Sequence, residues 1–249
     1  NDPVGVVGAE LGHSVQNRET HGFLFALRGL LEYARATNDA ELKRFVRSSY
    51  DYWRSFGIPE IGWIVGRPSA YAFTETCAIA DMVYLAVKMS DYGVGDYWED
   101  VDQYVRNQLV EQQLSDREQL AACAAASFPH EARRPFEDSH RAVERSLGSF
   151  ANIPFVTYYP EPWTGPCCNH NGAQALYQAW EGIVRNAGHG IAQVNLLLNR
   201  ASPQLDVDSY LPYEGKVVLK NKTAGRIHVR IPNWVSKAKV RCQIAGTTV

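Results

Sequence analysis

The chain has 249 residues, of which 45% are hydrophobic and 21% charged, as in ordinary globular proteins. Its formal net charge is −2 and it contains no run of Lys or Arg, so we expect no nucleic-acid partner. The longest apolar stretches are far shorter than a bilayer requires, so we expect no transmembrane segment. The opening segment, NDPVGVVGAE, has neither a signal-peptide pattern nor an initiator Met, so we expect a fragment or a processed chain.

The first part of the chain predicts helices. Apolar residues recur with helical spacing from Thr20, and residues 37–39 (TND) are expected to end that helix and cap the next, which runs to about Phe56. The stretch 57–70 (GIPEIGWIVGRPSA) predicts a loop, and long ordered loops in compact domains are often functional. Another helix is expected to begin near Thr74. Further helical patterns cover residues 97–113, 116–126, 139–147 and 171–186.

After Gly188 the period of the pattern changes. Short runs such as GKVVLKN and RIHVRIP alternate apolar and polar residues and are separated by turn residues, which is typical of strands. A run of helices followed by a run of strands favours separate domains over a wound α/β sheet. We therefore expect an α+β multidomain protein, with a helical region over residues 1–187 and an antiparallel β region over residues 188–249.

Cysteine usage is informative. There are five cysteines, an odd number, and two of them are adjacent in the chain. Such a set is a poor framework for disulfides and suits a reduced protein with a metal site or a catalytic thiol. Thiol usage of this kind predicts a cytoplasmic location.

Two short motifs carry the chemistry. The first, TETCAIAD (74–81), places Glu75 and Cys77 at the start of a helix, and the second, GPCCNHN (165–171), places two cysteines before a helix N-terminus. One carboxylate and three thiolates complete a tetrahedral zinc shell. A helix N-terminus also favours the thiolate over the thiol, because its dipole and free N–H groups stabilise negative charge.

The residues alone also allow a reading without metal. Thr74 is then an N-cap, Glu75 complements the helix dipole, and Cys77 is a small buried residue. Cys167 and Cys168 would be ordinary core residues or a reactive pair. Composition and spacing leave both readings open.

These segments resemble glycoside hydrolase family 127, the β-L-arabinofuranosidase family formerly described as domain of unknown function 1680. That family has an E-x-C motif at a helix start and a later C-C-x-x-N motif, which here correspond to residues 75–77 and 167–171. Residues 21–42 and 193–234 are similar to the family as well. The resemblance implies part of an (α/α)6 barrel followed by a β-sandwich, in a chain that covers only part of both. Half a toroid leaves apolar helix faces uncovered, so a homo-oligomer is an expected possibility.

The resemblance also implies a mechanism, which is retaining hydrolysis of L-arabinofuranosides or similar terminal sugars. The implied Zn²⁺ ligands are Glu75, Cys77, Cys167 and Cys168, and Cys167 is also the implied nucleophile. The general acid/base is expected upstream of the E-x-C motif, where Glu60 is the acidic residue of the loop 57–70.

Three histidines are candidates for contacts with the carbohydrate. His13 and His21 lie just before or at the first helix, and His170 lies inside CCNHN, near the implied zinc ligands. Asn171 matches the family Asn and can equally well cap its helix.

Two further hypotheses stay open. In one, the chain is a truncated or degenerate relative whose zinc is structural or serves sugar binding alone. In the other, Cys167 and Cys168 are a redox pair without metal.

Overall fold

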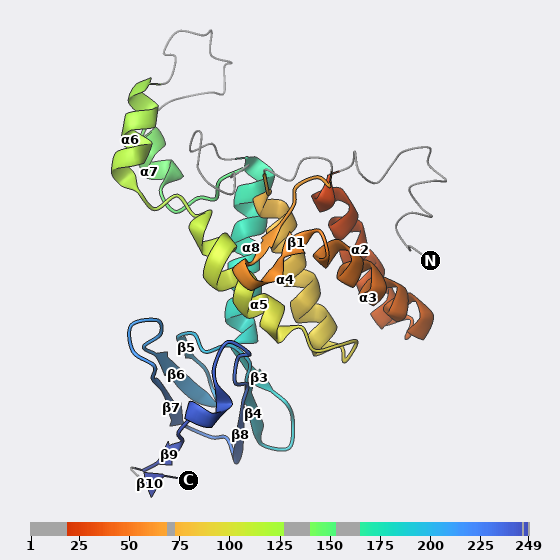
Figure 1. The fold of residues 1–249 in the computed structure, drawn as a ribbon, viewed down its shortest axis with the longest axis vertical. Helices are drawn as coiled ribbons and strands as arrows, with labels where there is room; N and C mark the ends of the chain where they lie inside the picture. Colours follow the sequence, from red (N-terminus) through yellow and green to blue (C-terminus); the bar gives the residue numbers. More distant parts are fainter. Residues whose placement is uncertain (1–18, 69–72, 127–139, 153–164, 246, 249) are drawn as a thin grey trace. The chain divides into compact units, whose positions relative to one another are not determined.

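A computed structural model describes the fold (Figure 1). The described residues are 19–68, 73–126, 140–152, 165–245 and 247–248. The chain forms two compact units, residues 1–178 and residues 179–249, and each is treated by itself. Helices dominate the first unit and strands the second, so the predicted α+β class is confirmed.

Three helices form the core of the first unit: α2 (Thr20–Ala36), α3 (Ala40–Arg54) and α4 (Thr76–Asp91). Helix α2 packs against both α3 and α4. Most side chains of α4 are buried on every side, as expected of a helix surrounded by others. None of the helices in the described part of the chain is long and apolar enough to cross a membrane.

The junction between α2 and α3 forms as its residues predict. Thr37 is the C-cap of α2, and Asn38 adopts a left-handed conformation with φ of 53°. The Asp39 carboxylate accepts a hydrogen bond of 2.9 Å from the Leu42 backbone N–H at the start of α3. An Asp in this position satisfies one of the free N–H groups of a helix start.

The segment after α3 is a small hairpin where the sequence predicted a loop. Strand β1 (Gly57–Ile58) pairs antiparallel with β2 (Trp63–Ile64), and the 3-10 turn η2 (Pro59–Ile61) joins them. Gly62 has φ of +63°, and a Cβ at this position would overlap the backbone of residues 103–104 on α5 (Trp98–Tyr104). This close approach requires glycine and holds the hairpin against α5.

The remaining helices of this unit follow in chain order. The π-helical turn η3 (Val105–Leu109) continues α5, and α6 (Arg117–Ala126) packs against α7 (Ala142–Ser146). Helix α8 (Pro166–Gly182) starts five residues earlier than its sequence pattern predicted, so the cysteine pair lies in its first turn and not before it. Proline suits the first position of a helix because its fixed φ is helical and the N–H it lacks has no partner there.

The second unit contains two three-stranded sheets. Their strand orders are β3-β4-β8 and β5-β6-β7, and Ala192, Val194, Leu205 and Val207 are buried. The strands are β3 (Val184–Asn186), β4 (Ile191–Val194), β5 (Arg200–Ala201), β6 (Leu205–Ser209), β7 (Val217–Asn221) and β8 (Arg226–Val229), followed by η4 (Lys237–Lys239), β9 (Gln243–Ile244) and β10 (Thr247–Thr248).

One strand pair departs from the predicted antiparallel region. Strands β4 and β8 are parallel, with Ile191 opposite Arg226. A parallel pair needs a long connection, and here the chain forms the whole β5-β6-β7 sheet between the two strands. Alternation along single strands cannot reveal this, because parallel and antiparallel neighbours share the same period of two.

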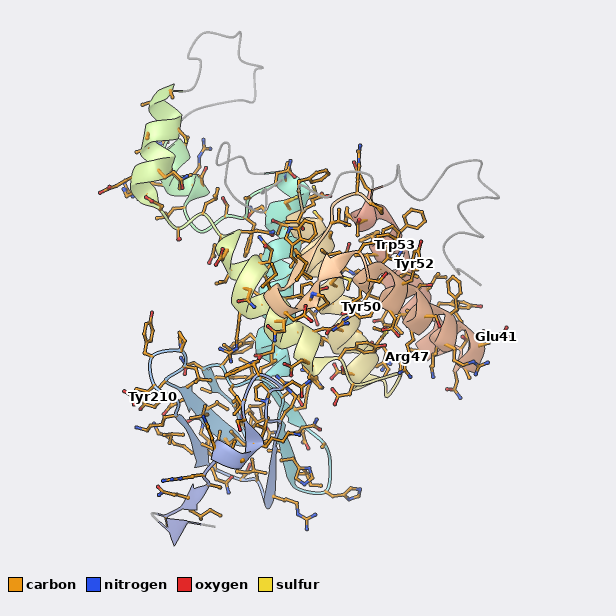
Figure 2. The ribbon with its side chains drawn as sticks, viewed as in Figure 1. Glu41, Arg47, Tyr50, Tyr52, Trp53 and Tyr210 are labelled. Carbon is orange, nitrogen blue, oxygen red and sulfur yellow. The ribbon has the colours of Figure 1, made fainter. Side chains whose placement is uncertain are left out.

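A buried carboxylate joins α3 to α5. Figure 2 marks Tyr50 on α3, and its hydroxyl donates to Asp100 at 2.8 Å. The Arg54 guanidinium donates to both Asp100 oxygens, at 2.7 and 2.9 Å. Burial and the charge of Asp100 raise the pKa of Tyr50 well above its ordinary value, so the hydroxyl stays a donor. All donors in this group therefore depend on a single acceptor.

Asp100→Asn should lower the free energy of unfolding by about 2 kcal/mol, because Arg54 and the Tyr50 hydroxyl lose a charged acceptor. Urea denaturation followed by circular dichroism measures this. The matched control is Glu214→Gln, the same acid-to-amide change at an exposed side chain, which should stay within about 0.5 kcal/mol. An unchanged midpoint in Asp100→Asn would contradict the assignment.

Candidate metal centre

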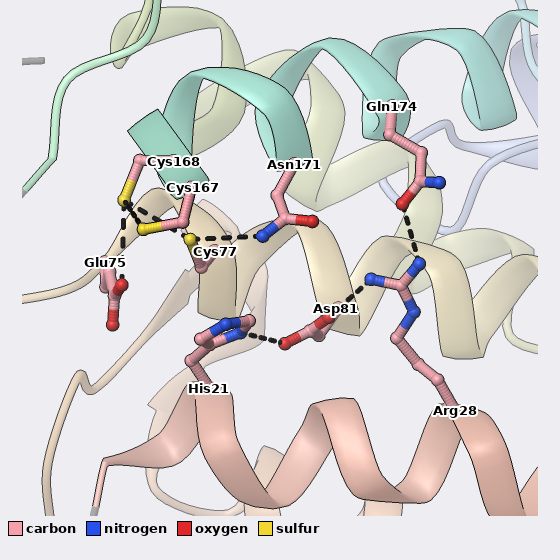
Figure 3. A network of polar contacts seen from close by, with 9 residues as sticks. All are labelled: His21, Arg28, Glu75, Cys77, Asp81, Cys167, Cys168, Asn171 and Gln174. Atoms are coloured by element: carbon pink, nitrogen blue, oxygen red, sulfur yellow. Dashed lines mark hydrogen bonds and ion pairs between the residues drawn. The ribbon is translucent and has the colours of Figure 1, made fainter. Parts of the chain in front are cut away.

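The N-terminal ends of α4 and α8 bring one carboxyl group and three thiols together (Figure 3). Glu75 is the N-cap of α4 and Cys77 lies in its first turn. Cys167 and Cys168 lie in the first turn of α8. Their ligand atoms all lie within 4.8 Å of one another, so the group can hold a metal ion.

The spacing of the donors suits a tetrahedral shell. Donors about 2.0–2.3 Å from a central zinc lie roughly 3.5–3.8 Å apart along the edges of the tetrahedron. The Cys168 sulfur lies 3.3 Å from the Cys77 sulfur, 3.9 Å from the Cys167 sulfur and 3.6 Å from a Glu75 carboxylate oxygen. The four residues brought together are the four that the sequence motifs single out.

The four clustered residues differ in burial. Cys77 and Cys168 are fully buried, Glu75 is partly exposed, and Cys167 is exposed. Cys167 is therefore the thiol that a molecule from solvent can reach. The other two sulfurs are enclosed by protein.

Each of three donors has a pKa shifted towards its protonated form. The hydrogen bond with Cys168, together with burial, raises the pKa of the Cys77 thiol far above its ordinary value. Burial raises the pKa of Cys167, and it raises that of the Glu75 carboxyl even though His21 opposes this. A cation at the centre must compete with protons for these donors, because the charged forms are the ligands.

Polar neighbours hold the first turn of α8 in place. The Asn171 amide donates to the Cys77 sulfur at 3.3 Å, and Asn152 Oδ1 lies 2.9 Å from the Cys168 sulfur. Gly172 packs so closely on buried Phe150 that a Cβ there would overlap the ring. Asn171 thus contacts Cys77, one of the four candidate metal ligands, whereas nothing in the sequence motifs indicated Asn152.

A second polar network lies beside the ligands (Figure 3). His21 Nδ1 lies 2.6 Å from Asp81 Oδ2, and Arg28 Nη1 donates to Asp81 Oδ1 at 2.8 Å. Arg28 Nη2 also donates to Gln174 Oε1 at 2.6 Å, which links α2 to α8. Of these residues the sequence indicated His21 alone. The sequence could have indicated Asp81 as well. It lies among apolar residues of its helix, and a carboxylate buried in such a place needs a charged or polar partner.

The other predicted site residues are placed differently. Glu60 is exposed on η2, which packs against α5 and β2, and it is close enough to Tyr104 to contribute to raising that tyrosine's pKa. His170 is exposed on α8, two residues beyond Cys168. His13 lies outside the described residues.

Cys168→Ser should lower zinc affinity by about 100-fold or more, because a ligand is lost and even outer partners of metal sites contribute 10–100-fold. Mass spectrometry of metal content should find about one zinc per wild-type chain, and competition with a chelator measures the affinity. Cys242→Ser, which changes an exposed cysteine outside the group, is the matched control. Equal affinities in the two variants would refute the site.

Zinc affinity of the wild-type chain should rise with pH. The raised pKa values mean that the Cys77 and Cys167 thiols carry protons near neutral pH which the metal must displace, and fewer protons are displaced as pH increases. Titration from about pH 6 to about pH 8 in several buffers, with proton release read by calorimetry, measures the effect. A pH-independent affinity without proton release would be incompatible with thiolate ligands.

The similarity of this chain to known proteins is found in its fold and not in its sequence. No protein-family model matches the chain, and no curated protein sequence matches it. A similar solved structure is the crystal structure of Ara127N-Se, a GH127 β-L-arabinofuranosidase from Geobacillus stearothermophilus T6, with a TM-score of 0.60 and 14% identity. The match covers 95% of this chain and 39% of that one, so this chain spans well under half of its neighbour's length. The chain therefore has a GH127-like fold.

Proposed function

We propose that this chain belongs to a zinc-dependent retaining glycoside hydrolase that releases L-arabinofuranose or a similar terminal sugar. The observation that carries the proposal is the meeting of Glu75, Cys77, Cys167 and Cys168 at two helix starts. The GH127-like fold supports it, because the structural neighbour is a β-L-arabinofuranosidase. The proposal includes an (α/α)6 barrel, to which the helical unit contributes, and a β-sandwich.

Zinc is the proposed metal because of the donor set. Three sulfurs and one carboxylate oxygen suit a borderline-soft ion that prefers four ligands. When bound, zinc keeps the thiols deprotonated near neutral pH and stabilises the thiolate that departs from the sugar.

Cys167 is the proposed nucleophile. Of the three cysteines in the group it is the exposed one, so an anomeric carbon can approach its sulfur from solvent. The helix dipole at the first turn of α8 acts in favour of the thiolate, but burial outweighs it and raises the pKa of Cys167, so the proposed metal is needed to keep the sulfur deprotonated. Cys77 and Cys168 are buried and act as ligands alone.

The proposed reaction has two displacements. The Cys167 sulfur attacks the anomeric carbon while the Glu60 carboxyl gives its proton to the departing oxygen, and a sugar–sulfur bond forms. Glu60 then takes a proton from water as that water attacks the same carbon and frees the thiolate. Two inversions give overall retention.

Glu60 is proposed because it is the acidic residue of the loop before the E-x-C motif. Its described contacts run to α5 and β2, and the group that can hold a metal is formed without it. Retaining hydrolysis requires the acid/base within about 5–6 Å of the nucleophile. The assignment of Glu60 is accordingly tested apart from that of Cys167.

A second candidate is a non-catalytic relative whose zinc is structural or serves sugar binding. The position of Glu60 against α5 favours it. A metal-free redox pair is the third candidate. The distances argue against a redox pair of adjacent cysteines, because the Cys168 sulfur lies closer to the Cys77 sulfur (3.3 Å) than to the Cys167 sulfur (3.9 Å).

Cys167→Ala should abolish hydrolysis of p-nitrophenyl β-L-arabinofuranoside, and Glu60→Gln should slow it by about 10²–10⁴-fold. In Glu60→Gln the slow second step should let a sugar adduct accumulate on Cys167, visible by mass spectrometry of quenched peptides. Cys242→Ser should retain wild-type rates.

The outcomes separate the candidates. Wild-type turnover in Cys167→Ala would eliminate the thiolate mechanism. An unaffected rate in Glu60→Gln would reject that residue as acid/base while leaving the nucleophile in place. Stoichiometric zinc with no turnover in the wild-type chain would favour the non-catalytic relative.

A further inference from the structure

Asp81 is a charged side chain in a fully buried position. It is 0% exposed, although it lies among apolar residues of α4. It follows Cys77 by four residues, one helical turn, so the two side chains share a face of α4. A carboxylate buried in this way is destabilising unless charged or polar partners meet it.

Arg28 supplies one partner and is itself held firmly. Its Nη1 donates to Asp81 Oδ1 at 2.8 Å, and its Nη2 donates to Gln174 Oε1 at 2.6 Å. The guanidinium carbon lies 4.1 Å from the centre of the Tyr84 ring, so the planar group also stacks on an aromatic face. Because Arg28 occupies Oδ1, the other carboxylate oxygen of Asp81 is directed at His21.

His21 completes the network towards the metal ligands. Its Nδ1 lies 2.6 Å from Asp81 Oδ2, and an ionised carboxylate only accepts hydrogen bonds, so Nδ1 carries the hydrogen. The two ring nitrogens point in different directions, so Nε2 faces away from Asp81. In Figure 3 the ring lies between Asp81 and Glu75, and Glu75 is close enough to raise the pKa of His21. The side chain keeps 22% of its surface exposed.

We propose that Asp81, held by Arg28, is a positioning residue that fixes His21 with Nδ1–H bonded to the carboxylate, so that Nε2 is presented to a sugar hydroxyl at the metal centre. The sugar in this statement rests on the proposed function. The bond to Asp81 raises the pKa of His21 more than burial lowers it, which agrees with a strong Nδ1–H contact. In its neutral form His21 then presents Nε2 as an acceptor, and as an imidazolium it presents a donor.

Asp81→Asn tests the hydrogen-bond pattern without changing the shape of the side chain. Arg28 is always a donor, so the oxygen of the new amide should face Arg28 and its NH₂ group should face His21. Nδ1 of His21 must then accept, and the hydrogen moves to Nε2. The matched control is Asp102→Asn, at another fully buried carboxylate paired with an arginine, Arg106.

The first readout is independent of any enzyme activity. Two-dimensional ¹⁵N spectra of histidine-labelled protein, recorded where the ring is neutral, report which nitrogen carries the hydrogen, and the spectrum of His21→Gln identifies the signals. The wild-type chain and Asp102→Asn should show the Nδ1–H form of His21, and Asp81→Asn the Nε2–H form. An Nε2–H form in the wild-type chain overturns the inference, and this measurement suffices even if Asp81→Asn does not fold.

The second readout is kinetic. Asp81→Asn should lower kcat/KM by about 10–100-fold, mostly through KM, because His21 contacts the sugar and not the reacting bond. Its zinc content should stay at the wild-type value, and Asp102→Asn should keep wild-type kinetics. An active wild-type chain with unchanged KM in Asp81→Asn overturns the inference and leaves the proposed function intact. If the wild-type chain has no glycosidase activity, the proposed function is wrong. The ¹⁵N measurement of the His21 tautomer then still tests whether Asp81 positions His21.

Discussion

The crowding of three sulfurs and a carboxylate within 4.8 Å is the constraint on which the site depends. Four groups that carry negative charge when ionised cannot lie so close together without a proton or a cation between them. In the metal-free chain the neighbouring sulfur of Cys168 raises the pKa of Cys77, and Cys77 adds to the effect of burial in raising that of Cys167. A divalent cation removes the conflict and turns the same crowding into coordination.

Bringing the four donors together requires two helix starts to meet, and several packing details serve this. Gly172 lets α8 approach Phe150, and the Thr76 hydroxyl donates to the Ala151 carbonyl at 2.5 Å. Helix α8 is thereby held against the segment that precedes it in the chain and against α4. The Arg28–Gln174 contact adds a second attachment farther along α8. These contacts hold the four candidate ligands together in the metal-free chain, and such preorganisation lowers the entropy that a metal site loses on binding.

Charge is distributed unevenly around this centre. On the side of α2 the buried carboxylate of Asp81 is matched by Arg28 and His21, so that region is a closed network of charged groups. On the side of α8 the exposed sulfur of Cys167 faces solvent. The exposed thiol of Cys167 and the imidazole held by Asp81 thus belong to two different surroundings, one open to solvent and one enclosed by charged groups.

The sequence by itself determined the helical unit in outline and the identity of the clustered residues. Local periodicity specified α2, α3 and α4, because a stripe of apolar residues every three to four positions must be buried, and Asp39 marked the start of α3. The E-x-C and C-C motifs contain all four residues that cluster, and their assignment as ligands came from the family resemblance, because the residues alone also allow a metal-free interpretation.

Tertiary structure alone decided the rest, because it concerns contacts between residues far apart in the chain. Asp81 meets Arg28 across 53 positions and His21 across 60, and no local pattern encodes such pairs. The hairpin at residues 57–64 packs Glu60 beside α5, the early start of α8 draws its cysteine pair into the first turn, and β4 and β8 pair in parallel around an intervening sheet. Each of these depends on which surfaces are available for burial, and that is settled only when the whole chain has folded.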